Sequence, residues 1–243
     1  MNSASPSGTD VFQWTANWAT DLAIPLWSAQ ETGSTNTIAK EAPVGSTTQL
    51  YLARNQTQGR GRNTNQWITP SGSSLLSSWS FLLQQVPQPI FSPLAGLALY
   101  DACLATWPDV AFNMKAPNDL YISDKKVAGL LIETIDQGHE IRTVIGLGFN
   151  ITAKPESVPT ATYLWPHLIG ALTEDRWRFF LNAWYKGVQE AIVGGQSGQL
   201  EAHERERLKT ALNRHPLLKE PILDVDERGQ LRSASRVIHW HEL

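Results

Sequence analysis

The sequence predicts an α+β fold in which packing helices cover a mixed, largely antiparallel sheet. Two apolar segments, residues 126–135 and 141–151, flank the turn at residues 136–138, which is the pattern of a β-hairpin. Residues 94–105 are almost continuously apolar over the length of a helix, and residues 173–192 repeat large apolar side chains at helical spacing. The chain therefore supplies paired strands and helices to cover them.

The other elements follow in chain order. Residues 49–53 and 73–83 have strand patterns, and residues 111–122 read as strand, turn and strand. Ser34 or Thr35 is a plausible N-cap for a short helix. The helix at residues 173–192 is expected to break at the glycine-rich segment 194–198, and residues 200–212 are predicted to form a second, more exposed helix.

Three segments make up the expected domain organisation. Residues 1–22 are predicted to be a flexible tail, because the chain opens with small, polar residues that include proline and glycine. Residues 23–215 are expected to be the main domain. Residues 216–243 are expected to be a short β segment, with a reduced hairpin formed by 222–226 and 236–240, that is too small for a core of its own.

The composition limits the classes of function. With 243 residues, 42% of them hydrophobic, the chain can bury a substantial core, and its net charge of −3 gives no overall attraction to nucleic acid or anionic membranes. Cys103 is the only cysteine and lies in an apolar segment, which favours packing over catalysis and a reducing cytoplasm as the setting. No signal-peptide pattern or membrane-spanning segment occurs, so we expect no membrane partner.

The segment from Gln56 to Trp67 contains no aliphatic residue and is predicted to be a surface loop. Its glycines, Gly59 and Gly61, allow positive φ and close backbone approach to a ligand, while Arg60 and Arg62 carry planar cations suited to carboxylate or phosphate oxygens. A solvated basic turn and an arginine-rich RNA-binding segment are the alternatives, and the net charge counts against RNA. We therefore predict a loop that closes over an anion.

Common catalytic signatures are missing from the sequence. It has no nucleophile elbow, no phosphate-binding Walker loop, no zinc-protease helix and no Cys/His metal cluster. Polar and glycine-containing segments instead recur at strand ends and turns: Ser34-Thr35-Asn36, Gln56 to Trp67, Lys115 to Asp119, Lys126 to Glu133 and Gly146 to Asn150. Each of them is a weak signal when taken alone.

Together and in this order, the five segments resemble the biotin-protein ligase family over about residues 26–151. That family has Ser-Thr-Asn, then Gly-Arg-Gly-Arg with a following Trp, then Lys-Trp-Pro-Asn-Asp, then a Lys-x-Ala-Gly strand ending in Glu, and then Gly-x-Gly-x-Asn. The chain matches each element, except that Ala116 stands where the family usually has Trp. The short C-terminal segment also departs from the family's usual small barrel.

The resemblance implies a fold of the class II aminoacyl-tRNA synthetase and biotin ligase type. It implies a monofunctional biotin–[acetyl-CoA-carboxylase] ligase without an N-terminal DNA-binding domain. Such an enzyme converts biotin and ATP, with Mg²⁺, to biotinyl-5'-AMP and transfers biotin to a lysine of a biotin carboxyl carrier domain. We expect no tightly bound organic cofactor, no DNA partner and a cytoplasmic location. A homodimer is possible. The alternatives are a lipoate or octanoate ligase or transferase of the same superfamily and a non-catalytic biotin-binding homologue.

The resemblance also assigns roles to residues of this chain. The implied catalytic residues are Lys115, Arg60 and Arg62. The implied biotin contacts are Ser34, Thr35, Asn36, Gln56, Gly59, Arg60, Lys115, Gly129 and Leu130. The implied ATP and adenylate contacts are Arg62, Trp67, Asn118, Asp119, Lys126 and Asn150, with Asp119 as the candidate magnesium ligand.

Overall fold

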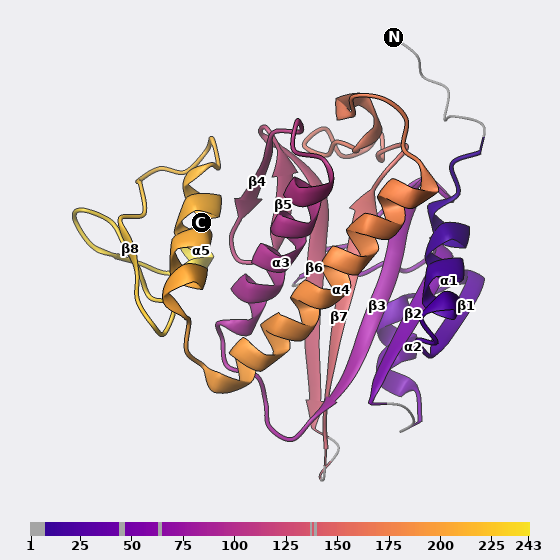
Figure 1. The fold of residues 1–243 in the computed structure, drawn as a ribbon, viewed down its shortest axis with the longest axis horizontal. Coiled ribbons are helices and arrows are strands. Elements are labelled where there is room, and N and C mark those ends of the chain that lie inside the picture. Colours follow the sequence, from indigo (N-terminus) through magenta and orange to yellow (C-terminus); the bar gives the residue numbers. More distant parts are fainter. Residues whose placement is uncertain (1–7, 44–46, 63–64, 137, 139) are drawn as a thin grey trace. The chain divides into compact units, whose positions relative to one another are not determined.

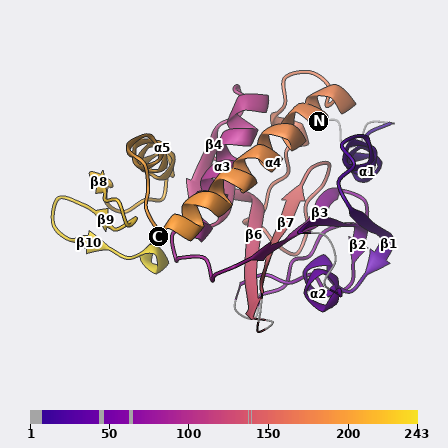
Figure 2. The ribbon, with the colours of Figure 1, turned by 60° about the horizontal axis from the view of Figure 1, so that its bottom comes forward.

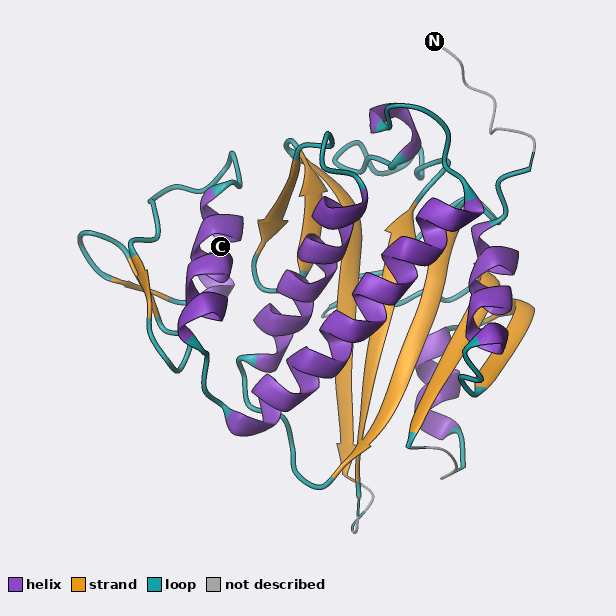
Figure 3. Ribbon diagram, viewed as in Figure 1, coloured by secondary structure: helices purple, strands orange, loops and turns teal. Residues whose placement is uncertain are grey.

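The computed structural model describes residues 8–43, 47–62, 65–136, 138 and 140–243, which fall into two compact units. The first unit contains the chain up to Val86 together with Val127–Leu181, and the second contains Pro87–Lys126 and Asn182–Leu243. Helices and strands occur in both units (Figure 3). This division does not fall at residue 215, where the sequence suggested that the main domain ends.

The sheet of the first unit has the strand order β1-β2-β3-β7-β6. Its strands are β1 (Leu26–Thr32), β2 (Thr48–Gln56), β3 (Ser74–Leu83), β7 (Ile141–Asn150) and β6 (Lys125–Asp136). Only β1 and β2 pair in parallel, and the predicted hairpin is the antiparallel pair β6 and β7, beside β3 in Figure 1. The prediction of a mixed, largely antiparallel sheet with packing helices is confirmed.

Neighbouring residues of β3 show how this sheet is covered. Trp79 makes an edge contact with Trp18 of α1 (Val11–Asp21), with ring centroids 6.2 Å apart. The Ser78 hydroxyl instead hydrogen-bonds with Thr35 and Asn36 of α2 (Thr35–Glu41). Because successive side chains of a strand point to opposite faces, α1 and α2 lie on opposite faces of the sheet, as Figure 2 shows. The α2 face is the one that carries the candidate site.

Helix α1 corrects the prediction of a flexible tail over residues 1–22. The Asp10 side chain accepts a hydrogen bond from the backbone N–H of Gln13 at 3.0 Å, which caps the helix. Buried residues recur at helical spacing through Phe12, Thr15 and Trp18, so the helix packs against the sheet. The prediction is therefore wrong for Val11–Asp21, while residues 1–7 lie outside the described part of the chain.

The second unit is built around the buried helix α3 (Phe91–Thr106), which the sequence predicted. Helix α4 (Glu174–Ser197) is longer than predicted, because Gly194 and Gly195 continue the helix. A Cβ on Gly195 would lie 2.7 Å from the Phe91 ring, and one on Gly194 would lie 2.8 Å from a Leu94 methyl group. These glycines thus serve close helix packing, and the turn comes at Gly198, whose φ is +68°.

The rest of the second unit consists of short elements: β4 (Phe112–Lys115), β5 (Asp119–Ile122), α5 (Ala202–Asn213), β8 (Asp224–Val225), β9 (Leu231–Arg232), β10 (Val237–Ile238) and the 3-10 turn η2 (Trp240–Glu242). The first unit adds a 3-10 turn, η1 (Trp165–His167). The predicted pairing of residues 222–226 with 236–240 is wrong, since β9 lies between β8 and β10 and pairs with both. The tight turn at Gly229, with φ +77°, places β9 directly after β8.

Cys103 is a free, fully buried thiol whose pKa is raised by burial, which agrees with its predicted packing role. Among the described residues, no helix combines the length and apolarity that crossing a bilayer requires.

Candidate functional site

The first part of the candidate site forms where α2 begins beside the end of β2. Gln56 is the last residue of β2, and its Oε1 atom accepts the backbone N–H of Thr35 at 2.6 Å and the Thr35 hydroxyl at 3.2 Å. Ser34 is the N-cap residue but makes no side-chain capping bond. The Gln56 side chain, at the end of β2, accepts a hydrogen bond from the first turn of the helix instead. Because a backbone N–H can only donate, the Gln56 amide has its oxygen toward α2, and its nitrogen remains as a donor.

The Asn36 side chain lies against strands β3, β7 and β6. Its Oδ1 accepts the Ser78 hydroxyl at 2.6 Å, and its Nδ2 donates to the Leu131 carbonyl at 3.2 Å and to Glu133 Oε2 at 2.9 Å. A Cβ on Gly146 would lie 2.1 Å from Asn36 Oδ1, which explains the glycine in this strand. The Asn36 amide is therefore fixed at both ends.

Glu133 gathers two cations at the same place. Its carboxylate lies 2.7 Å from Lys40 Nζ and 3.1 Å from Arg60 NH1. Burial by itself raises the pKa of Glu133, but hydrogen bonds from Lys40 and Asn36 and the charges of Lys40 and Arg60 outweigh it and hold the pKa below its ordinary 4.5. Lys40, Ser78 and Glu133 were not among the predicted site residues. The matched Lys-x-Ala-Gly segment ends in Glu133 and was the only signal that pointed to any of them.

The arginine/glycine loop folds back on itself in the residues that are described. Trp67 donates its backbone N–H to Gly59 O at 2.9 Å, and Gly61 donates to Asn65 O at 2.8 Å. Gly59 and Gly61 are not among the positive-φ residues, so the predicted use of their conformational freedom is wrong. Gly59 is needed for close approach instead, since its Cβ would lie 2.3 Å from Trp67 O. Residues 63–64 lie outside the described part of this loop.

Trp67 and Asn150 were both predicted to contact the nucleotide. The Trp67 indole lies on Gly148 of β7, where a Cβ would come within 2.3 Å of the ring. Asn150 is buried, and its side chain donates to Thr162 O at 3.0 Å and accepts from Ser74 at 3.3 Å. Both ends of the Asn150 amide are thus engaged by the protein itself, which favours a structural role for this residue.

A second group of predicted residues lies in the second unit, on the hairpin of β4 and β5. Lys115 and Asp119 are paired positions of that hairpin, and Asp119 Oδ1 lies 2.7 Å from Lys126 Nζ. Asn118, in the turn between the strands, is buried. The Lys115 ammonium lies 5.8 Å from the centroid of the Tyr121 ring. The hairpin therefore carries one cation and one carboxylate, and the start of β6 adds a second cation through Lys126.

His215 belongs to this second group, although its sequence context gave no sign of it. Asn113 Nδ2 donates to the Ser123 carbonyl, so Asn113 Oδ1, 2.6 Å from His215 Nδ1, must accept. The imidazole therefore carries its proton on Nδ1. Burial and the charge of Lys115 hold the pKa of His215 below its ordinary 6.5, which keeps the ring neutral.

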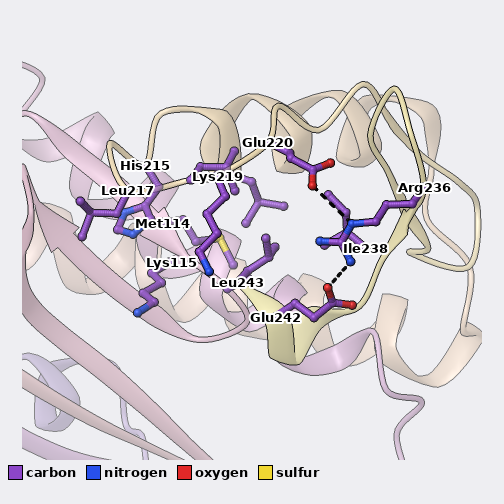
Figure 4. Close-up of a pocket in the computed structure, with 13 residues that line it drawn as sticks. Met114, Lys115, His215, Leu217, Lys219, Glu220, Arg236, Ile238, Glu242 and Leu243 are labelled. Atoms are coloured by element: carbon purple, nitrogen blue, oxygen red, sulfur yellow. Dashed lines mark hydrogen bonds and ion pairs between the residues drawn. The ribbon is translucent and has the colours of Figure 1, made fainter.

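A cavity of about 270 Å³ opens beside the same hairpin (Figure 4). Lys115 and Ala116 line it, and Arg236 forms ion pairs with Glu220 and Glu242 on the opposite side. The other lining residues are Met114, Leu212, His215, Leu217, Leu218, Lys219, Ile238 and Leu243. The position where the family usually has Trp is therefore next to open space.

The described residues offer no site built from protein side chains alone for a resident magnesium ion. No three His, Cys, Asp or Glu side chains gather in the described part of the chain, and the Asp119 carboxylate is already paired with Lys126. Mg²⁺ often uses one or two carboxylates together with substrate phosphates. We therefore treat magnesium as part of the MgATP substrate and assign it no step.

The predicted residues thus form two groups, each within one unit. The first unit holds Ser34, Thr35, Asn36, Gln56, Gly59, Arg60, Arg62, Trp67, Gly129, Leu130 and Asn150. Gly129 and Leu130 are buried in β6, and Gly129 pairs with Gly148. The second unit holds Lys115, Asn118, Asp119 and Lys126.

Known proteins share this sequence pattern and fold. The profile of the Biotin/lipoate A/B protein ligase family matches residues 29–150. The biotin–[acetyl-CoA-carboxylase] ligase of Paracoccus denitrificans is 37% identical over 135 residues, 52% of this chain and 54% of that protein. The bifunctional ligase/repressor BirA of Escherichia coli is 34% identical over 106 residues, 42% of this chain and 33% of that protein. The match thus spans about half of the Paracoccus denitrificans protein and about a third of the Escherichia coli protein.

A solved structure supports the fold over a longer stretch. The biotin protein ligase of Aquifex aeolicus, solved in complex with biotin and ATP, matches with a TM-score of 0.66 and 23% identity, covering 88% of this chain and 94% of that one. At this identity the likeness establishes the fold alone.

Proposed function

Because this chain belongs to the biotin/lipoate A/B protein ligase family, we propose that it is an ATP-dependent biotin–protein ligase. In this proposal it forms biotinyl-5'-AMP from biotin and ATP and passes the biotinyl group to a lysine of a biotin carboxyl carrier domain. The observation that carries the proposal is the polar cluster of Thr35, Asn36 and Gln56, whose side chains are held by hydrogen bonds within the first unit. The comparisons support the choice of biotin, since the Paracoccus denitrificans relative is a biotin–[acetyl-CoA-carboxylase] ligase and the Aquifex aeolicus protein was solved in complex with biotin and ATP.

The first unit offers suitable partners for a small polar ring that bears a carboxylate. Gln56 presents an amide donor, since Thr35 occupies its oxygen, and Arg60 adds a cation at the edge of the cluster. A ureido ring such as that of biotin needs fixed donors and acceptors, whereas the chain of lipoate or octanoate needs mainly apolar walls. The polar character of this cluster therefore favours biotin over the other acyl groups.

The proposed reaction has two balanced steps. A biotin carboxylate oxygen attacks the α-phosphorus of ATP, and the bond to the β-phosphate bridging oxygen breaks, so pyrophosphate leaves. A lysine amine of the carrier then attacks the anhydride carbonyl, loses a proton and releases AMP. Both steps concentrate negative charge at the α-phosphate, and the two cations of the second unit, Lys115 and Lys126, are proposed to stabilise it.

The experiment combines the purified chain, biotin, MgATP and a carrier domain, and follows the carrier by mass spectrometry. We expect one added biotinyl group per carrier and biotin-dependent release of pyrophosphate. A carrier with its acceptor lysine changed to arginine is the control and should stay unmodified. In the proposal the protein works in the cytoplasm, where both ATP and the carrier are found.

The alternatives give different results in the same experiment. Lipoate- or octanoate-dependent pyrophosphate release without a biotin signal would assign the chain to the other branch of the family. Heat of biotin binding in calorimetry without any ATP turnover would identify a binding protein instead of a ligase.

A further inference from the structure

Glu133 has three partners drawn from distant parts of the first unit. Oε1 accepts from Lys40 Nζ at 2.7 Å, Oε2 accepts from Asn36 Nδ2 at 2.9 Å, and Arg60 NH1 lies 3.1 Å from Oε1. Asn36 and Lys40 belong to α2, Arg60 to the arginine/glycine loop and Glu133 to β6. One carboxylate therefore connects the loop, the helix and the sheet.

The Glu133 side chain is well placed to fix these groups. Only 19% of it is exposed, compared with 45% of the Arg60 side chain. An exposed arginine gains little from a single surface ion pair, but a sheltered carboxylate that also accepts an amide bond holds a more defined geometry. Asn36 is fixed from the other side by the buried hydroxyl of Ser78, so Glu133 completes its orientation.

The charges in this group do not cancel. Lys40 and Arg60 bring two positive charges, and Glu133 brings one negative charge, so the three side chains keep a surplus of one positive charge. A surplus cation beside the polar residues Thr35, Asn36 and Gln56 suits a ligand that combines a polar ring with a carboxylate.

We propose that Glu133 is a positioning residue that holds Arg60 and Asn36 in the orientation that binds the carboxylate-bearing substrate. The proposal rests on the proposed function above. Glu133 touches no substrate in this account, because its own charge would repel a carboxylate. It acts through the guanidinium and the amide that it holds, and Lys40 offsets the charge that Glu133 brings.

The first test uses the free protein and needs no activity. In a protein labelled with ¹⁵N-arginine, the Arg60 Nε–H signal is assigned by its loss in Arg60→Lys. We expect Glu133→Gln to move or broaden this signal, while the signal of Arg54, which pairs with Asp10, stays in place. An Arg60 signal that is identical in wild type and Glu133→Gln overturns the proposal, whatever the protein catalyses.

The second test measures biotin-dependent pyrophosphate release. We expect Glu133→Gln to raise the KM for biotin about tenfold, with a smaller change in kcat and none in the KM for ATP. Glu133→Asp keeps the charge and should recover part of the loss. The matched control is Asp21→Asn, which removes the 2.5 Å ion pair with Arg178 elsewhere in the same unit and should leave both KM values unchanged.

The outcomes separate the positioning role from the proposed function. A Glu133→Gln protein that melts at a lower temperature but keeps the wild-type KM for biotin would show a merely structural residue and overturn the proposal. Wild-type protein without biotin-dependent turnover would refute the ligase function, and the arginine signal would then decide whether Glu133 holds Arg60.

Discussion

The two groups of site residues differ in how their polar atoms are used. In the first unit, hydrogen bonds from Thr35 to Gln56 and from Asn36 to Glu133 and Ser78 fix the polar side chains. In the second unit, Lys126 pairs with the Asp119 carboxylate, whereas Lys115 has no ion-pair partner in the part of the chain that the structure describes. A preorganised cluster suits recognition of a fixed polar shape, whereas an uncompensated cation suits charge that develops during a reaction.

The largest expected effect comes from removing the cation of the second unit. Lys115→Met should lower kcat for biotin-dependent pyrophosphate release by about 100-fold, because one electrostatic contact to a developing charge is typically worth this much. The matched control is Lys125→Met, which removes an exposed lysine at the start of β6 and should change kcat little. Equal kcat values in Lys115→Met and the control would remove Lys115 from the mechanism.

Two glycines of β7 allow the preorganised cluster to be broken selectively. A Cβ at position 146 would strike the Asn36 amide, and one at position 148 would strike the Trp67 indole. We expect Gly146→Ala to raise the KM for biotin about tenfold or more, and Gly148→Ala to act mainly on the KM for ATP. Steady-state kinetics with each substrate varied in turn would measure both.

The two glycine variants are controls for each other, since they make the same change two residues apart on one face of one strand. If both raised the same KM, the separate assignment of Asn36 to biotin and of Trp67 to ATP would fail. If Gly148→Ala changed only the melting temperature, Trp67 would be a packing residue.

Local patterns predicted much of the fold, and the failures have physical causes. Alternation and apolar length identified β3, β7 and α3, because burial on one or both faces leaves a direct mark in the sequence. Helix α1 was missed because small, polar residues that include proline and glycine directly precede it in the sequence. The extension of α4 was missed because a glycine that packs against Phe91 looks the same in a sequence as one that ends a helix.

The candidate site was predictable only in part. Thr35, Asn36 and Gln56 were identified through the resemblance, and the structure brings them together. The contact of Asn36 with Glu133 joins residues 97 positions apart, and no local spacing encodes it. His215 is similar, since its partner Asn113 lies 102 positions away in the chain. Long-range polar contacts follow from tertiary packing, so they required the structure.

The smallest expected effect is the pH dependence of the protein's stability that His215, in the second group, causes. Burial and the charge of Lys115 keep the pKa of His215 below 6.5, so the unfolded chain binds a proton at a higher pH than the folded protein does. The stability from the neutral ring is complete above pH 6.5 and is lost as the pH falls toward the folded pKa. For one proton the slope cannot exceed about 1.4 kcal/mol per pH unit.

Urea unfolding between about pH 7.5 and pH 5 would measure this loss. His215→Asn keeps an N–H near Asn113 Oδ1 but cannot take up a proton, so its stability should fall less steeply with pH than that of the wild type. His203→Asn, on the exposed surface of α5, is the matched control and should follow the wild-type slope. Glu133 and Asp10 do not interfere, since their pKa values lie below their ordinary 4.5 and 3.8. Parallel slopes for wild type and His215→Asn would show that His215 takes up no additional proton when the protein unfolds. That result would contradict a neutral imidazole beside Lys115 in the folded protein.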